Sequence, residues 1–171
     1  IHFFDSKENI FDHFNLNREL EKALSRKVWL KSGGYLVFDR TEAMTVIDVN
    51  TGKYIGKKDL QETILKTNLE AAEEIARQVR LRDIGGIILI DFIDMGKKEH
   101  QKMVMNVLEQ FLSHDRTRSS LVQMSELGLV EMTRKRVRKN LDAILCEPCN
   151  CCQGEGRVLS IETIAINFFR R

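Results

Sequence analysis

The sequence shows none of the features of membrane-spanning, secreted or low-complexity chains. Its 171 residues contain a single proline, Pro148, and no repeat or biased tract. No apolar stretch approaches the roughly 20 residues that a membrane-spanning helix needs, and the first residues lack the basic and apolar segments of a signal peptide. With 43% hydrophobic and 30% charged residues, the composition predicts one globular domain with a small appendage.

The sequence also lacks the bulk positive charge of many nucleic-acid-binding proteins. Lys and Arg number 27 and Asp and Glu number 25, which gives a net charge of only +2. A nucleic-acid partner therefore has to be inferred from local clusters of basic residues. The four histidines are scattered, and no pair of them is spaced for a histidine-based nuclease mechanism or a metal site.

Hydrophobic periodicity predicts an α/β fold. Residues 28–38 predict a hairpin, 43–49 a strand, and 87–90 a wholly apolar strand of the kind that is buried on both faces. Apolar residues recur at helical spacing from 60 to 81, which predicts a long helix. We also expect helices at 17–27, 98–113, 129–141 and 161–169, a strand at 119–124 and a turn at 50–53.

Two of the predicted strands close with an aspartate, Asp48 and Asp91. Side chains at the ends of neighbouring strands in such a sheet converge on one crevice. Two carboxylates repel each other there unless a divalent cation lies between them, and Mg²⁺ is the usual ion, with water and a substrate phosphate as its other ligands. Such an ion activates water and polarises a phosphodiester. The alternative is that each aspartate only caps a strand or a turn.

Two polar residues accompany these acids. Asn50 is a candidate to hold a metal-bound water or to orient Asp48. Asp94 is either a third metal ligand or the cap of the helix that starts near Lys98, and we favour the cap.

Basic residues gather in two places. The run from Arg134 to Lys139 contains three arginines and two lysines, which would give the helix expected at 129–141 a basic face. Phosphate backbones bind such faces. Arg116 and Arg118 form a second positive patch. Either cluster is also explained as ordinary solvated surface.

The four cysteines lie within seven positions. The longer stretch that contains them, 146–156, has the composition of a linker between two packed parts. Such a cluster connects no distant segments, which favours metal-binding thiolates in a reducing compartment over disulfides. Cys-x-x-Cys pairs suit tetrahedral zinc. One chain could supply all four sulfurs, but two adjacent cysteines cannot easily both bind one ion. If each chain supplies only two sulfurs, two chains would share the zinc. The cysteines are Cys146, Cys149, Cys151 and Cys152.

Together, these motifs resemble the ribonuclease E/G family, and its ribonuclease G branch in particular. The matching segments follow the family's order from about residue 29 to 156. They are Thr45–Gly52 and Ile90–Met95 as the acidic motifs, Thr67–Gly86 as the signature helix, Gly128–Arg136 as the basic stretch and Cys149–Gly156 as the zinc link.

The resemblance implies a Mg²⁺-dependent endoribonuclease that cuts single-stranded RNA in RNA processing and decay. It implies that Asp48 and Asp91 hold the catalytic metal with the help of Asn50. It also implies that Cys149 and Cys152 share one zinc between two protomers of a homodimer or higher oligomer. The further cysteines, Cys146 and Cys151, depart from this minimal zinc-binding pattern.

For RNA binding, the resemblance points to Arg118 and to the basic stretch with Arg134 and Arg136. It implies an S1 domain and a 5′-monophosphate sensor outside this chain, and a cytoplasmic location in a bacterium or a plastid. We therefore expect a piece of a longer protein that cuts RNA weakly or not at all by itself. The rival hypotheses are a zinc-dependent RNA-binding or dimerisation module without catalysis, and a DNA nuclease.

The resemblance also implies a division into parts. Residues 1–30 would end an RNase H-like subdomain, and 31–145 would form a DNase I-like catalytic subdomain, a mixed sheet with flanking helices. The zinc link would occupy 146–156, and 157–171 would begin a small helical dimerisation domain.

Overall fold

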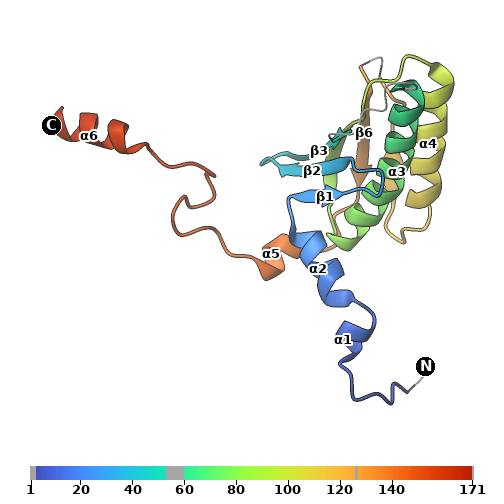
Figure 1. The fold of residues 1–171 in the computed structure, drawn as a ribbon, viewed down its shortest axis with the longest axis horizontal. Coiled ribbons are helices and arrows are strands. Elements are labelled where there is room, and N and C mark those ends of the chain that lie inside the picture. Colours follow the sequence, from blue (N-terminus) through green and yellow to red (C-terminus); the bar gives the residue numbers. More distant parts are fainter. Residues whose placement is uncertain (1–2, 53–59, 126, 171) are drawn as a thin grey trace.

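The computed structural model describes residues 3–52, 60–125 and 127–170, and it confirms an α/β fold with a mixed sheet and flanking helices (Figure 1). The predicted turn at 50–53 ends in Lys53, which lies outside the described residues. The elements are α1 (Ile10–His13), α2 (Leu16–Leu24), β1 (Lys27–Trp29), β2 (Tyr35–Arg40), β3 (Met44–Asn50), α3 (Leu60–Leu81), β4 (Gly86–Asp91), α4 (Lys98–Leu112), β5 (Ser119–Leu121), β6 (Leu129–Arg134), α5 (Leu141–Leu145) and α6 (Ile161–Phe169).

The six strands form one sheet in the order β1-β2-β3-β4-β6-β5. β3 and β4 run parallel, since α3 lies between them in the chain and returns it to the starting edge. The other neighbouring pairs are antiparallel. Because β3 and β4 are parallel neighbours at the centre of the sheet, their carboxyl ends meet at the same edge.

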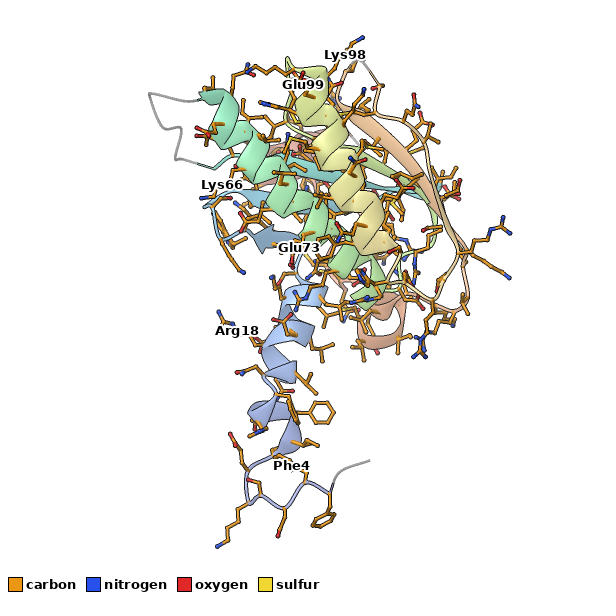
Figure 2. All side chains as sticks on the ribbon, turned by 90° about the vertical axis from the view of Figure 1, so that its right-hand side faces the viewer. Phe4, Arg18, Lys66, Glu73, Lys98 and Glu99 are labelled. Atoms are coloured by element: carbon orange, nitrogen blue, oxygen red, sulfur yellow. The ribbon has the colours of Figure 1, made fainter. Side chains whose placement is uncertain are left out.

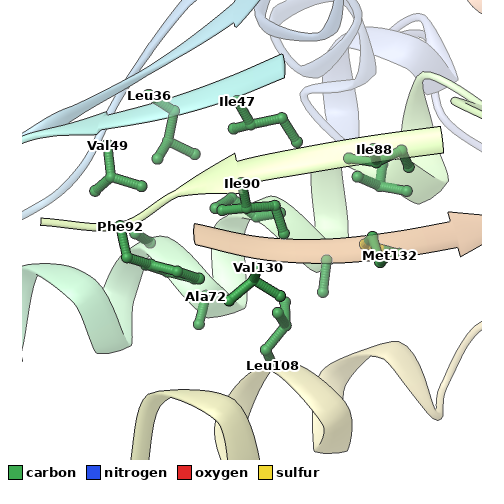
Figure 3. Packing of buried hydrophobic residues seen from close by; sticks show 14 of the residues in the cluster. Leu36, Ile47, Val49, Ala72, Ile88, Ile90, Phe92, Leu108, Val130 and Met132 are labelled. Atoms are coloured by element: carbon green, nitrogen blue, oxygen red, sulfur yellow. The ribbon is translucent and has the colours of Figure 1, made fainter. Parts of the chain in front are cut away.

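Helices α3 and α4 lie side by side on one face of this sheet (Figure 1). Every second strand residue points toward them, and the buried side chains interdigitate in one cluster (Figure 3). Exposed charged residues such as Lys66 and Glu73 line the outward side of α3 (Figure 2). The fully buried strand residues of this core are Leu36, Ile47, Ile88, Ile90, Val130 and Met132, and the helices add Ala71, Ala72, Ile75, Val79, Val104 and Leu108.

The opposite face of the sheet is open. In β4, Ile88 and Ile90 are buried, whereas Ile87 is 50% exposed and Asp91 is exposed. The prediction that this strand is buried on both faces is therefore wrong, because α3 and α4 both pack on the same side. An apolar run thus predicted the strand correctly but not its environment.

The helix predicted at 129–141 is also wrong. Its first six residues form β6, which pairs with β4 and β5, and α5 begins only at Leu141. Val130 and Met132 are fully buried at two-residue spacing, while Glu131 and Thr133 are exposed, which is the alternation of a strand. The strand predicted at 119–124 is shorter in the structure and ends at Leu121.

A buried arginine connects α2 to the sheet. Arg82 is 4% exposed and donates hydrogen bonds to the carbonyl oxygens of Lys22 and Ser25, at 3.1 and 2.8 Å. Its guanidinium carbon lies 4.0 Å from the ring centre of Phe38. These contacts hold the segment that leads into β1, the strand with which the sheet begins at Lys27.

Residues after α5 extend away from the sheet (Figure 1). The helix predicted at 161–169 is present as α6, and its end residues Ile161 and Phe169 are 86% and 85% exposed. Across the described parts of the chain, no helix combines the length and the hydrophobicity needed to cross a membrane.

Candidate functional site

Asp48 and Asp91 lie side by side where β3 and β4 end. They are partners in the parallel register, so their side chains leave the same face of neighbouring strands about 5 Å apart. The preceding residues, Ile47 and Ile90, are fully buried, so strand alternation directs both acids to the open face. The structure thus brings together the two carboxylates that the sequence predicted to converge.

Asn50 is the second polar side chain of this site. Its Nδ2 donates a hydrogen bond to Oδ2 of Asp48 over 2.7 Å. Strand alternation puts both side chains on the open face of β3. This hydrogen bond fixes the orientation of the Asp48 carboxylate, which is one of the two roles that the sequence suggested for Asn50.

The turn that follows β3 packs against the turn that precedes β2. Gly52 has a φ of +71°, and a Cβ there would lie 2.2 Å from the carbonyl oxygen of Gly33. A Cβ at Gly34 would lie 2.7 Å from the carbonyl oxygen of Asn50. Glycines at these positions therefore allow the two turns to meet beside the acids.

A third acid, Asp94, lies close to this pair. Partial desolvation raises the pKa of the Asp91 carboxyl, and the negative charges of Asp48 and Asp94 raise it further. The prediction that Asp94 caps the next helix is wrong, because the cap of α4 is Lys97, with no side-chain cap bond. A signal was present in the spacing of Asp91 and Asp94, but it did not distinguish a cap from a site residue.

Asn68 of α3 fixes the backbone that follows Asp91. This fully buried amide donates to the carbonyl oxygen of Ile93 at 2.8 Å and accepts from the Ile93 N–H at 3.2 Å. Because these two bonds hold the chain between Asp91 and Asp94, they position two of the three acids. Sequence reasoning missed Asn68 as an individual residue, although it lies in the segment that resembles the family's signature helix.

Replacing Asn68 by Ala will destabilise the fold and loosen the loop that carries Asp94. We expect a loss of about 1–3 kcal/mol in the free energy of unfolding, because the Ile93 peptide groups lose their partners. Urea titration followed by circular dichroism measures this loss. The matched control is Lys66→Ala on the solvent side of the same helix, which should stay within about 0.5 kcal/mol of wild type. Equal effects of the two substitutions would contradict the positioning role of Asn68.

Arg118 and Arg136, two of the arginines predicted to bind RNA, lie far from the acids. Arg118 immediately precedes β5, whose first residue is level with the start of β4, and the Nε of Arg136 donates to the carbonyl oxygen of Gly85 over 3.1 Å. The acids lie at the other end of β4, about 16 Å along the strand. Both arginines are exposed.

Arg134 has a different environment. Its side chain is 3% exposed and makes ion pairs of 2.8 Å with both Asp83 and Asp115. Burial works to raise the pKa of these two carboxyls, but hydrogen bonds from Arg134, joined by Arg138 at Asp83 and by the Thr117 N–H at Asp115, together with the positive charges of nearby arginines, hold both pKa values below the usual range. The guanidinium is therefore paired with two carboxylates inside the protein, and an RNA-binding role of Arg134 stays a prediction.

A basic groove of about 450 Å³ lies at the arginine end of the sheet. Arg136, Arg138 and Lys139 line it from one side and Arg40 from the other, with Asp83 as an acidic member. Arg40 donates to the side-chain oxygen of Asn140 over 3.0 Å, which connects the two sides. The charge run noticed in the sequence therefore forms a concave surface instead of the face of a helix.

The cysteines lie in an exposed turn after α5. The N–H of Gln153 donates to the carbonyl oxygen of Cys149 over 2.6 Å, and Gln153 and Gly154 both have positive φ values. Hydrogen bonds from Cys152 and Cys151 lower the pKa of the Cys149 thiol, which favours the thiolate form that binds metals. The turn is thus suited to present Cys149 and Cys152 to a zinc ion.

Within the described ranges, no group of three or more His, Cys, Asp or Glu side chains could hold a metal ion by itself. Mg²⁺ needs only one or two protein carboxylates, because water and substrate phosphates complete its ligand shell. The pKa of Asp91 is raised by partial burial and then by the negative charges of Asp48 and Asp94, and those same charges attract a cation. Asp48 and Asp91 therefore fit Mg²⁺, whereas zinc would need ligands from beyond one Cys-x-x-Cys pair.

Comparison with known proteins gives one consistent result. The profile of the Ribonuclease E/G family matches residues 1–137. Ribonuclease G from Escherichia coli (strain K12) is 50% identical over 167 residues, which are 98% of this chain and 34% of that protein. Ribonuclease G from Haemophilus influenzae is 46% identical, and the match covers 98% of this chain and 34% of that protein. Ribonuclease E from the same organism is 41% identical, and the match covers 99% of this chain and 18% of that protein. The chain thus spans about a third of the length of its ribonuclease G relatives.

Proposed function

Because this chain belongs to the ribonuclease E/G family, we propose that it carries the catalytic acids of an endoribonuclease that hydrolyses phosphodiesters in single-stranded RNA. The observation that best supports this is the register of β3 and β4, which pairs Asp48 with Asp91 on an open face. An open face beside two acids admits a long, flexible polymer, whereas an enclosed pocket would admit only a small molecule. RNA processing and decay in the cytoplasm is the setting that the family suggests.

In this proposal, Asp48 and Asp91 hold a Mg²⁺ ion. Mg²⁺, when bound, polarises the phosphodiester and lowers the pKa of a bound water. Asn50 keeps the Asp48 carboxylate in a fixed orientation through its 2.7 Å hydrogen bond. Asp94 adds negative charge beside Asp91 and so strengthens the attraction for a cation.

We assign RNA-backbone binding to exposed arginines at the far end of the sheet. Arg118 and Arg136 lie about 16 Å from the acids, measured along β4, and a single-stranded RNA several nucleotides long can bridge this separation. Neither arginine has a carboxylate partner among the hydrogen bonds and ion pairs of the described residues. Their charges are therefore available to phosphates.

We further propose that Cys149 and Cys152 bind half of a zinc site, and that a second copy of the chain supplies the other half. Two thiolates from each chain complete the four tetrahedral ligands of a structural zinc. Cys149 is exposed and Cys152 is half-buried in this turn, and the segment that carries them extends away from the sheet (Figure 1). Cys146 and Cys151 are not required in this arrangement.

Zinc analysis tests this arrangement directly. We expect one zinc per two chains and a solution mass of a dimer or a higher oligomer. Cys149→Ser should remove the zinc and dissociate the oligomer, because a site with one thiolate per chain lacks two ligands. The matched control is Cys146→Ser, which should change neither quantity. One zinc bound to a monomer would contradict the shared site.

The proposed activity is tested in a graft, an Escherichia coli ribonuclease G in which the 167 aligned residues are replaced by the matching residues of this chain. The graft supplies the rest of a family protein, without which we expect weak cleavage. It should cut a single-stranded RNA in the presence of Mg²⁺, leave the matching DNA strand intact and lose activity when the metal is chelated. Equal cutting of DNA would favour a DNA nuclease. RNA binding without cleavage would favour a module without catalysis.

A further inference from the structure

Three side chains form a cluster on the hairpin of β1 and β2. The rings of Trp29 and Tyr35 are 5.3 Å apart between centroids, in an edge-to-face arrangement. The ammonium of Lys27 lies 4.1 Å from the Trp29 ring centre and 3.4 Å from that of Tyr35. Trp29, the single tryptophan of the chain, is nevertheless 61% exposed.

The cluster shares its sheet face with the acids. Trp29 pairs with Tyr35, and Tyr35 pairs with Asn50, so these three side chains form one row across β1, β2 and β3. The next row on the same face runs from Lys27 through Val37 to Asp48 and Asp91. Trp29 therefore lies only two strand spacings, roughly 10 Å, from Asn50.

Sheet stability alone explains this cluster poorly. A cross-strand aromatic pair stabilises a hairpin only modestly. That gain depends on contact between the rings and does not require a tryptophan that remains mostly in water. An exposed indole beside a lysine is, however, suited to single-stranded nucleic acid, because bases stack on aromatic rings and an ammonium attracts phosphate.

We propose that Lys27, Trp29 and Tyr35 form a base-stacking platform that holds a nucleotide of the RNA strand next to the phosphate at Asp48 and Asp91. This inference rests on the proposed ribonuclease function and adds a binding subsite to it. The ring of Trp29 stacks on a base, and Lys27 balances the charge of the adjoining phosphate. Stacking of this kind accepts any base, since every base has a π-face.

Tryptophan fluorescence of the 171-residue chain tests the platform, because Trp29 is its single tryptophan. A short single-stranded RNA should quench this fluorescence, and an oligomer with the same phosphates but no bases should not. With a labelled RNA, Trp29→Ala should bind about ten-fold more weakly, and Trp29→Phe should recover most of the affinity. The matched control, Phe11→Ala, removes an exposed ring from α1 and should bind as wild type does.

The outcomes separate this inference from the proposed catalysis. In the graft, Asp48→Asn should abolish cleavage, whereas the 171-residue chain with the same substitution should keep its RNA-dependent fluorescence quenching. In the graft, Trp29→Ala should raise KM far more than it lowers kcat. Unchanged RNA affinity in both Trp29 variants would overturn the platform, even if the acids proved catalytic. So would a change in oligomeric state without a change in RNA affinity, since that result would identify the face as a contact between copies.

Discussion

Asp48→Asn and Asp91→Asn will each reduce RNA cleavage by on the order of a thousand-fold, because a metal site on two carboxylates stabilises the transition state by several kcal/mol. Each substitution keeps the size of the side chain and removes one of the two charges that hold the cation. The rate is measured in the graft at saturating RNA. Because the effect lies in the chemical step, kcat should fall much more than KM rises.

The same variants should remain folded. The pKa of Asp91 is raised because burial and the charges of Asp48 and Asp94 oppose its ionised form. Replacing Asp91 by Asn removes that repulsion, so the urea midpoint of the chain should stay constant or rise. A loss of activity together with unfolding would instead mean that the acids support the structure.

Asp39→Asn is the matched control for both variants. Asp39 lies on the same open face but at the far end of β2, where it forms an exposed ion pair with Arg26 at 2.6 Å. Removing its charge should leave kcat within about two-fold of wild type, because exposed pairs contribute little. A kcat that falls equally in the Asp39 and Asp48 variants would show that the charge of the whole face matters, and not this pair.

Arg134→Met will lower the free energy of unfolding by about 3–5 kcal/mol, since it leaves Asp83 and Asp115 without their buried partner. The side chains of Asp83 and Asp115 are only 14% and 7% exposed, so water replaces the lost hydrogen bonds only in part. A loss of this size is a large part of the stability of an ordinary domain. Urea titration measures it as a shift of the unfolding midpoint.

Arg138→Met provides the comparison for Arg134. Arg138 makes a 2.8 Å ion pair with the same carboxylate, Asp83, but its own side chain is 78% exposed. We expect a change of no more than about 1 kcal/mol, because surface pairs are screened and their side chains are mobile. Similar effects of the two substitutions would contradict the view that Arg134 is an internal support of β6.

Much of the candidate site could be predicted from the sequence, because its residues end apolar runs. The runs before Asp48 and Asp91 are long enough to identify strands, and an intervening helix between two strands favours a parallel pair. Those two rules are enough to predict that the acids lie close together. Asn50 followed from its position two residues after Asp48, which alternation places on the same face.

The parts that failed depend on contacts between distant residues. The charges after Arg134 suggested a helix, although the alternation of Val130 and Met132 already had the period of a strand. The burial of Arg134 could not be predicted, because its partners, Asp83 and Asp115, are 51 and 19 positions away. The platform at Trp29 depends in the same way on the register of β1 with β2 and of β2 with β3.

Binding of a divalent cation to the isolated chain tests the central claim most directly, because it requires neither RNA nor other domains. Mn²⁺ shares the oxygen-ligand preference of Mg²⁺ and is detected by its paramagnetic resonance. Beyond any zinc, we expect one ion per chain in the wild type, with binding at least about ten-fold weaker in Asp48→Asn and in Asp91→Asn and unchanged in Asp39→Asn. Wild-type affinity in the two acid variants would contradict a metal held between Asp48 and Asp91.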